Sequence, residues 1–143
     1  MAKSPQHPLA HKNLGAMYYL DGNIDEAEKE FTKAMNLNSE ESMIYNNLGL
    51  IYFQKGDLAK AEEFFQKELK QNPVYDNAYF NWGLVYYQKG QEKKAEEMWL
   101  KTVEINPDHA DALRNLAIYY SQIKDTKKAN YFYQEATKRG VSF

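Results

Sequence analysis

A ten-residue segment recurs four times along the chain at a constant spacing. The copies are NLGAMYYLDG from Asn13, NLGLIYFQKG from Asn47, NWGLVYYQKG from Asn81 and NLAIYYSQIK from Asn115. Each copy begins 34 residues after the previous one. A repeat of this length is one supersecondary unit, which buries its apolar face only against a neighbouring unit. The spacing therefore predicts a stack of four similar units.

Each unit has the pattern of two helices joined by a short turn. In the first helix apolar residues recur at helical spacing, as in Tyr45, Leu48 and Tyr52. Glycine then favours the left-handed end of that helix, and an Asn or Asp suits the N-cap of the second helix. Pro disfavours helix in the residue before it, so the Asn-Pro pairs at 72–73 and 106–107 end the second helix. The residues concerned are Gly22, Gly56 and Gly90, and Asn23, Asp57 and Asp125.

Small and aromatic residues recur at fixed positions within the repeat. The first helix carries a small residue three positions before a tyrosine, and the second helix carries an alanine one turn before an aromatic residue. We expect the small residues to let paired helices approach closely, and the aromatic residues to fill the space between neighbouring pairs. The small residues are Gly15, Gly49, Gly83 and Ala117, with Ala27, Ala61, Ala95 and Ala129; the aromatic residues of the second helix are Phe31, Phe65, Trp99 and Tyr133.

This pattern resembles the tetratricopeptide repeat (TPR) family over residues 8–143. The resemblance implies an all-α fold, a right-handed superhelical α-solenoid of four helix-turn-helix units in a single domain. The repeats would span 8–41, 42–75, 76–109 and 110–143, after a disordered N-terminal segment at 1–7. It also implies that the first helices line a concave groove used to bind other proteins.

Composition excludes several other classes of protein. Hydrophobic residues make up 43% of the chain and aromatic residues 15%, which argues against disorder. The net charge of −2 is unlike the basic excess of a nucleic-acid binder, and no apolar run is long enough to cross a bilayer. The first residues, MAKSPQHP, show no signal peptide, and the chain has no cysteine. We therefore expect a cytoplasmic location, with no membrane or nucleic-acid partner.

Asparagine occupies the same groove position of all four units. In the family the groove is lined by positions 2, 5, 6, 9, 12 and 13 of the first helix, and position 6 is Asn13, Asn47, Asn81 and Asn115. A side-chain amide has donors and an acceptor, so it can bind the C=O and N–H of a peptide unit together. The resemblance implies that this asparagine ladder holds an extended peptide by its backbone. The alternative is that these asparagines cap or bridge adjacent repeats, or are simply solvated.

Other groove positions supply apolar, aromatic and basic side chains beside the asparagines. Apolar and aromatic residues at positions 9 and 12 would form pockets for ligand side chains, although aromatic residues at helical spacing are also typical of a core. Residues at position 5 vary from unit to unit, as a ligand-specific surface would. The further candidate peptide-binding residues are Lys12, Tyr19, Leu50, Phe53, Leu84, Tyr87 and Arg114.

One subtype of the family grips the C-terminal carboxylate of a chaperone with basic residues and asparagines at set groove positions. Lys12 and Asn47 match that pattern, whereas Ala16, Asn77 and Asn81 do not. A peptide of mixed or apolar character, internal rather than C-terminal, fits the groove positions better.

No catalytic or metal-binding constellation is apparent. His7 and His11 have no Cys or Asp beside them, and no Gly-rich phosphate loop is present. The pairs at 62–63 and 96–97, each two glutamates near a lysine, are interpreted as solvated helix faces. The sequence therefore predicts a protein that is not an enzyme and has no metal or cofactor.

The end of the chain suggests a second kind of function. No further helix follows the fourth unit, and its last helix carries Tyr131, Phe132 and Tyr133. Solenoids usually need a polar capping element at this place. The leading hypothesis is a non-catalytic scaffold that binds an extended peptide in its groove. The alternatives are a structural module that self-associates through these three aromatic residues into a homo-oligomer, and an accessory domain of a larger complex.

Overall fold

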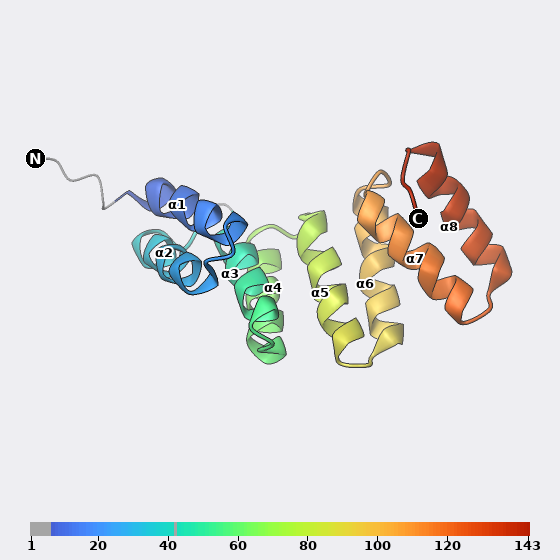
Figure 1. The fold of residues 1–143 in the computed structure, drawn as a ribbon, viewed down its shortest axis with the longest axis horizontal. Helices are drawn as coiled ribbons and strands as arrows, with labels where there is room; N and C mark the ends of the chain where they lie inside the picture. The colour runs from blue at the N-terminus through green and yellow to red at the C-terminus, as the bar shows by residue number, and fades with distance from the viewer. Residues whose placement is uncertain (1–6, 42) are drawn as a thin grey trace, which may run out of the picture. The chain divides into compact units, whose positions relative to one another are not determined.

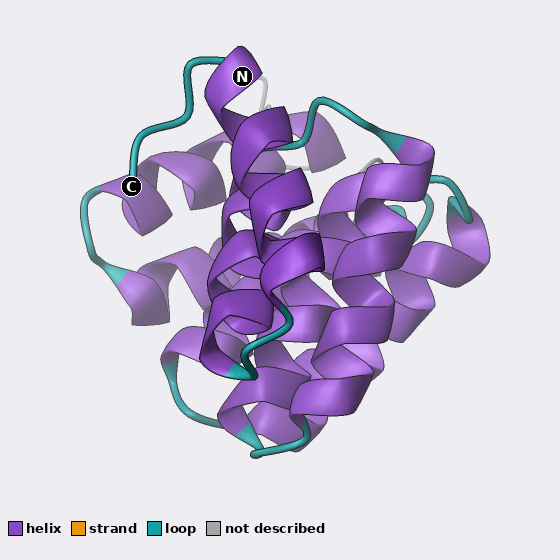
Figure 2. Cartoon of the chain, turned by 90° about the vertical axis from the view of Figure 1, so that its right-hand side faces the viewer, coloured by secondary structure: helices purple, strands orange, loops and turns teal. Residues whose placement is uncertain are grey.

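The computed structural model describes residues 7–41 and 43–143, which form helices and the turns between them (Figure 1). Over this part of the chain no strand is present, as Figure 2 shows. Eight helices follow one another in the described residues, two in each predicted repeat. Their bounds are α1 Pro8–Leu20, α2 Ile24–Leu37, α3 Ile44–Gln54, α4 Leu58–Gln71, α5 Asp76–Gln88, α6 Glu92–Ile105, α7 Ala110–Gln122 and α8 Thr126–Lys138.

The helices form two compact units, Met1–Pro73 and Val74–Phe143. In each unit the two helices of a repeat pack against each other, and the second helix of one repeat packs against the first helix of the next. Each unit thus holds two of the four predicted repeats, and the assignment of 8–143 to a single domain stays a prediction. Of the predicted disordered segment, 1–6 lie outside the described residues, as does Ser42; His7 caps α1, its Nδ1 accepting from the backbone N–H of Leu9 at 3.2 Å.

The predicted turn residues lie at the helix ends. Asp57 and Asp125 are N-caps whose carboxylates accept from the backbone N–H three residues on, each at 3.2 Å. Asn23 is at the N-cap of α2, without a side-chain bond. Gly56 has φ +82°, in the left-handed region that glycine adopts without strain. The sequence therefore located these boundaries correctly.

Helix α3 starts two positions later in its repeat than the other first helices do. It begins at Ile44, after Met43 in the left-handed conformation (φ 66°). A backbone N–H in the first turn of α3 has its hydrogen-bond acceptor on another helix. This is the N–H of Asn46, which donates to the carboxylate of buried Glu68 of α4 at 3.0 Å. Burial raises the pKa of Glu68, and the backbone N–H groups of Asn46 and Tyr45 oppose that rise. Glu68 thus caps the start of α3 from another helix, while the side chain of Met43 at the N-cap position makes no such bond.

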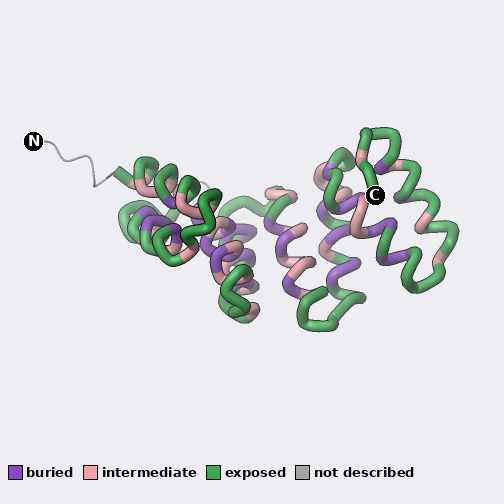
Figure 3. The backbone as a smooth tube through the Cα atoms, viewed as in Figure 1, coloured by how far each residue is buried: buried purple, intermediate pink, exposed green. Residues whose placement is uncertain are grey.

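The small residues of the first helices allow an aromatic ring to lie directly on the helix backbone. A Cβ placed on Gly15 would lie 2.9 Å from the ring of Phe31, and on Gly49 it would lie 2.5 Å from the ring of Phe65. A Cβ on Gly83 would meet Trp99 at 2.5 Å. In Figure 3 the buried parts of each pair lie where its two helices face each other. The predicted close approach of paired helices is therefore confirmed.

A tyrosine–glutamate hydrogen bond joins neighbouring repeats in both units. Tyr52 of α3 donates to Glu28 of α2 at 2.5 Å, and Tyr120 of α7 donates to Glu96 of α6. The two pairs are equivalent, 68 residues apart. Glu96 is buried, so the interpretation of 96–97 as a solvated face is wrong for its first residue. The acceptor is needed because burial of the tyrosine hydroxyl would otherwise leave a donor unpaired.

Alkaline pH tests the first of these bonds. The hydrogen bond that Tyr52 donates to Glu28, together with burial, raises the pKa of Tyr52 from an ordinary value of 10.0 to about 12. A raised pKa contributes stability that is complete below pH 10 and is lost as the pH rises through 12. Because the side chain is partly exposed, we expect this contribution to be only about 1 kcal/mol. Urea unfolding at pH 9 to 12 should show a steeper loss for the unaltered chain than for Tyr52→Phe; parallel losses would contradict the prediction.

Candidate functional site

Each unit contains a pocket lined by one asparagine of the ladder. The Asn47 pocket, of about 240 Å³, lies in the first unit, and the Asn115 pocket, of about 260 Å³, lies in the second. The Asn47 pocket is lined by Ala16, Tyr19, Leu20, Phe31, Asn47 and Leu50. The Asn115 pocket is lined by Leu84, Tyr87, Trp99, Asn115, Ile118, Tyr119 and Gln122.

The two pockets are built in the same way from equivalent residues. Both helices of one repeat contribute, and the first helix of the next repeat supplies the asparagine together with the apolar residue three positions later. Five lining positions coincide when the chain is shifted by 68 residues. The equivalent pairs are Ala16 and Leu84, Tyr19 and Tyr87, Phe31 and Trp99, Asn47 and Asn115, and Leu50 and Ile118.

The pockets combine an amide with apolar and aromatic walls. Asn47 and Asn115 are both half-buried. The indole N–H of Trp99 already donates to the backbone C=O of Phe80 at 3.3 Å, and the ring of Tyr87 lies 5.8 Å from the Trp99 ring, between centroids. Among the described residues that line the two pockets, none is charged. Such a pocket suits an uncharged side chain beside a peptide unit that the amide can bind.

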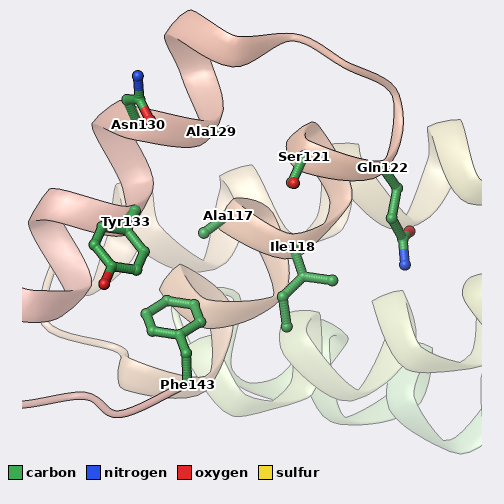
Figure 4. A pocket seen from close by; sticks show the side chains of 8 residues that line it. All are labelled: Ala117, Ile118, Ser121, Gln122, Ala129, Asn130, Tyr133 and Phe143. Atoms are coloured by element: carbon green, nitrogen blue, oxygen red, sulfur yellow. The ribbon is translucent and has the colours of Figure 1, made fainter.

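A third pocket lies at the end of the second unit and contains a residue of the chain's own last segment (Figure 4). This Phe143 pocket has a volume of about 290 Å³, and the rings of Phe143 and Tyr133 lie 4.9 Å apart in it. One residue before Phe143, the backbone C=O of Ser142 accepts a hydrogen bond from Nε of Arg114 at 3.2 Å. The lining residues are Ala117, Ile118, Ser121, Gln122, Ala129, Asn130, Tyr133 and Phe143.

The remaining candidates for peptide binding lie in different environments. Asn13 is exposed, whereas Asn81 is buried with 8% of its surface accessible. Lys12 pairs with Glu41 at 3.4 Å. Arg114 also pairs with Asp111 at 2.9 Å, and Phe53 is half-buried. Of the ladder, the structure therefore brings Asn47 and Asn115 into pockets, together with Tyr19, Leu50, Leu84 and Tyr87.

The proposed self-association residues divide into exposed and buried ones. Tyr131 and Tyr133 are 58% and 51% exposed. Phe132 is 8% exposed and stacks on Tyr120 at 5.7 Å, so its expected exposure is wrong. Phe132 of α8 packs against α7 within the core cluster that contains Tyr120, whereas its two neighbours do not belong to that cluster. The exposed set is therefore Tyr131 and Tyr133, and Tyr133 is partly covered by Phe143.

Some residues of the pocket walls are not among the predicted peptide-binding residues. Phe31 and Trp99 were assigned to packing between repeats, but each also lines a pocket beside an asparagine. Their shared repeat position was a usable signal, because a residue between two repeats can face both the core and the groove. The contacts of Phe143 gave no such signal, since they occur once in the chain.

The histidines have protein partners. Nδ1 of His11 lies 2.7 Å from Glu30, and His109 contacts Asn77 through Nε2 at 2.8 Å and caps α7 through Nδ1. Within residues 7–41 and 43–143, no group of three or more potential metal ligands is found. No helix in that part of the chain is both long and apolar enough to cross a bilayer.

Comparison with known proteins identifies relatives of this architecture. The family model for the tetratricopeptide repeat matches residues 6–72 and 75–139. The crystal structure of MamA superimposes with a TM-score of 0.83 at 26% identity, over 96% of this chain and 80% of that one. No curated protein sequence matches significantly.

Two further structures share the fold at lower identity. PilF of Pseudomonas aeruginosa has a TM-score of 0.88 at 20% identity, over 98% of this chain and 64% of that one. The first TPR of Spaghetti (RPAP3), bound to the HSP90 peptide SRMEEVD, has a TM-score of 0.76 at 24% identity, over 83% and 94%. The predicted all-α solenoid class is confirmed.

Proposed function

Because the chain belongs to the tetratricopeptide repeat family, whose members are generally protein–protein interaction modules, we propose that it is a non-catalytic scaffold that binds an extended peptide segment of a partner protein. Asn47 and Asn115 would hold the peptide backbone in the two units, with Asn13 and Asn81 at the equivalent positions of the other repeats. Absence of an enzymatic activity, a cofactor or a nucleic-acid partner, and a cytoplasmic location, stay predictions.

The observation that carries the proposal is the recurrence of one pocket in both units. A core asparagine that only bridged repeats would not need an apolar hollow beside it, yet both asparagines have one, built from equivalent residues. An extended peptide presents a backbone amide and a side chain in alternation, and each pocket offers an amide beside an apolar wall. The chemistry of the pockets thus fits a peptide better than a small polar metabolite.

The chemistry of these pockets does not favour an acidic peptide. The HSP90 peptide bound to the RPAP3 repeat, SRMEEVD, contains three acidic residues. In this chain Lys12, one of two matches to the carboxylate-binding pattern, is already paired with Glu41, and no basic residue lines either pocket among the described residues. A charged side chain would lose hydration there without a compensating partner.

A peptide array tests the function. The purified chain is applied to 12-residue peptides of randomised sequence, half of them uncharged, and binders are measured in solution by fluorescence anisotropy. We expect Asn47→Ala and Asn115→Ala together to weaken uncharged binders roughly 10- to 100-fold, because each lost buried hydrogen bond costs about 1 kcal/mol or more.

Asn36 is an exposed residue of α2, so Asn36→Ala serves as the matched control and should bind normally, and both the control and the double variant should retain the helical signal in circular dichroism. Unchanged affinity of the double variant would refute backbone binding by these amides.

Self-association is the second candidate function, favoured by the exposure of Tyr131 and Tyr133 on α8. Sedimentation velocity over a range of concentrations tests it: a mass that rises with concentration, and that Tyr131→Asp with Tyr133→Asp abolishes, would support this alternative. A constant monomeric mass would dismiss it.

A further inference from the structure

The last residues of the chain show how a non-helical segment binds to a first helix. Residues 141–143 follow the end of α8 and are not helical. Arg114 of α7 donates to the backbone C=O of Ser142, and the ring of the next residue, Phe143, packs against Tyr133 and lines the pocket there, with 57% of the residue exposed. Figure 4 shows the two rings next to each other, with Ala117 and Ile118 of α7 beside them. The segment is held by this hydrogen bond, by the ring of Phe143, and by Val141, which packs against the core and donates its backbone N–H to the C=O of Ala136.

Three residues that line the Phe143 pocket have equivalents one repeat earlier, and those equivalents line the Asn115 pocket. Ile118, Ser121 and Tyr133 of the Phe143 pocket stand 34 residues after Leu84, Tyr87 and Trp99 of the Asn115 pocket. Ile118 lines both pockets. In the Asn115 pocket the described lining residues all belong to α5, α6 and α7, so no side chain corresponding to Phe143 is among them. The half-buried side chain of Asn115 also lines this pocket.

Size and charge limit what this pocket accepts. Its volume of about 260 Å³ is below the roughly 300–1,000 Å³ typical of small-molecule sites, and suits one side chain. Its described lining is uncharged, so a charged side chain would be buried without a partner. Tyr87, Trp99 and Tyr119 offer three rings, and aromatic pairs are stabilised beyond the burial of their area.

We propose that the Asn115 pocket binds an aromatic side chain from an uncharged, extended segment of a partner protein, which lies against Trp99 as the ring of Phe143 lies against the equivalent Tyr133. The inference rests on the proposed function and adds to it the class of partner segment. A phenylalanine in the segment enters between Leu84, Tyr87 and Ile118, and the amide of Asn115 binds the adjoining backbone.

The probe is the peptide acetyl-Gly-Val-Ser-Phe-Gly-Ser-amide, which repeats the sequence of the bound segment. Two matched peptides carry alanine or glutamate in place of phenylalanine. Binding is read from the fluorescence of Trp99 in a Trp82→Phe chain, since these are the two tryptophans of the sequence and Trp99 lines the pocket. We expect the phenylalanine peptide to bind at least tenfold more tightly than either matched peptide. Equal affinities of all three peptides would overturn the proposal. This comparison needs no substitution in the pocket.

Two protein variants at the same repeat position locate the site. Tyr87→Asp alters a 39% exposed residue that lines the Asn115 pocket, and Ser121→Asp alters the equivalent residue, which lines the Phe143 pocket. We expect the first variant to lose at least tenfold in affinity and the second to stay within twofold. The reverse order would place the peptide in the Phe143 pocket and contradict the proposal.

The failure of this inference differs from failure of the proposed function. If array peptides bind through Asn47 and Asn115 but show no preference for an aromatic residue, the inference fails alone. If Asn115→Ala leaves the affinity of the phenylalanine peptide unchanged while Tyr87→Asp removes it, backbone binding fails and the aromatic pocket stands. Self-association that Phe143→Ser and Tyr87→Asp each abolish would identify a second copy as the occupant, which contradicts a partner protein.

Discussion

Gly49→Val is expected to lower the free energy of unfolding by about 3 kcal/mol, near the upper end of the range for overpacked cores. A Cβ on Gly49 would lie 2.5 and 2.7 Å from two carbons of the Phe65 ring, which is itself fully buried. Ala61 and Leu69, one turn before and after Phe65 on α4, are buried as well, so the ring lies within a packed helix face. Urea unfolding followed by circular dichroism measures the loss.

Ala59→Val is the control, since Ala59 is an exposed residue of α4 and the change costs only the lower helix propensity of valine, roughly 0.5 kcal/mol. A Phe65→Leu background should recover part of the loss at Gly49, because the smaller side chain withdraws from the added atoms. Equal losses at positions 49 and 59 would show that the close approach of α3 and α4 does not limit the residue at 49.

The periodic part of this structure could be read from the sequence because the same contact is made in every repeat. Gly15, Gly49 and Gly83 each face an aromatic residue of the second helix, and a contact made three times leaves a pattern at fixed spacing. The fourth repeat confirms the reason: Ala117 replaces glycine there, and the partner residue Tyr133 is half exposed rather than buried. The helix ends were equally predictable, since Gly56 and Asp57 act through local backbone chemistry.

Features that occur once, or that depend on burial by another helix, could not be predicted. Glu68 caps α3 from a different helix, and its sequence neighbours give no sign of that role. Glu96 looked solvated beside Lys94, because a sequence of charges shows neither which face a helix buries nor which hydroxyl lies opposite. The hydrogen bond of Arg114 to Ser142 joins residues that are 28 positions apart in the sequence. No equivalent bond is described in the other repeats, so it leaves no periodic pattern. Of the residues that line the two pockets, the sequence therefore predicted Asn47 and Asn115 but only some of the apolar and aromatic residues beside them.

Tyr120→Phe is expected to destabilise the chain by about 2 kcal/mol, whereas the equivalent Tyr52→Phe should cost less than about 1 kcal/mol near neutral pH. The side chain of Glu96 is 8% exposed and that of Glu28 is 26% exposed, so only Glu96 would lose its buried donor without ready access to water. Both carboxylates keep a lysine, Glu28 with Lys55 at 2.5 Å and Glu96 with Lys93 at 3.2 Å, so the expected difference rests on the deeper burial of Glu96. Thermal unfolding of the two variants at pH 7 measures the difference directly.

The Glu96→Gln variant decides whether the charge of the acceptor matters. Burial, and the hydrogen bond to the Glu96 carboxylate, raise the pKa of Tyr120, which means that the neutral hydroxyl and the charged acceptor stabilise each other. If so, Tyr120→Phe should cost less in a Glu96→Gln background, because a neutral amide rather than a buried carboxylate then loses the hydroxyl donor. Equal costs in the two backgrounds would mean that the hydroxyl of Tyr120 stabilises the repeat to the same extent whether or not its acceptor is charged, and would contradict the prediction.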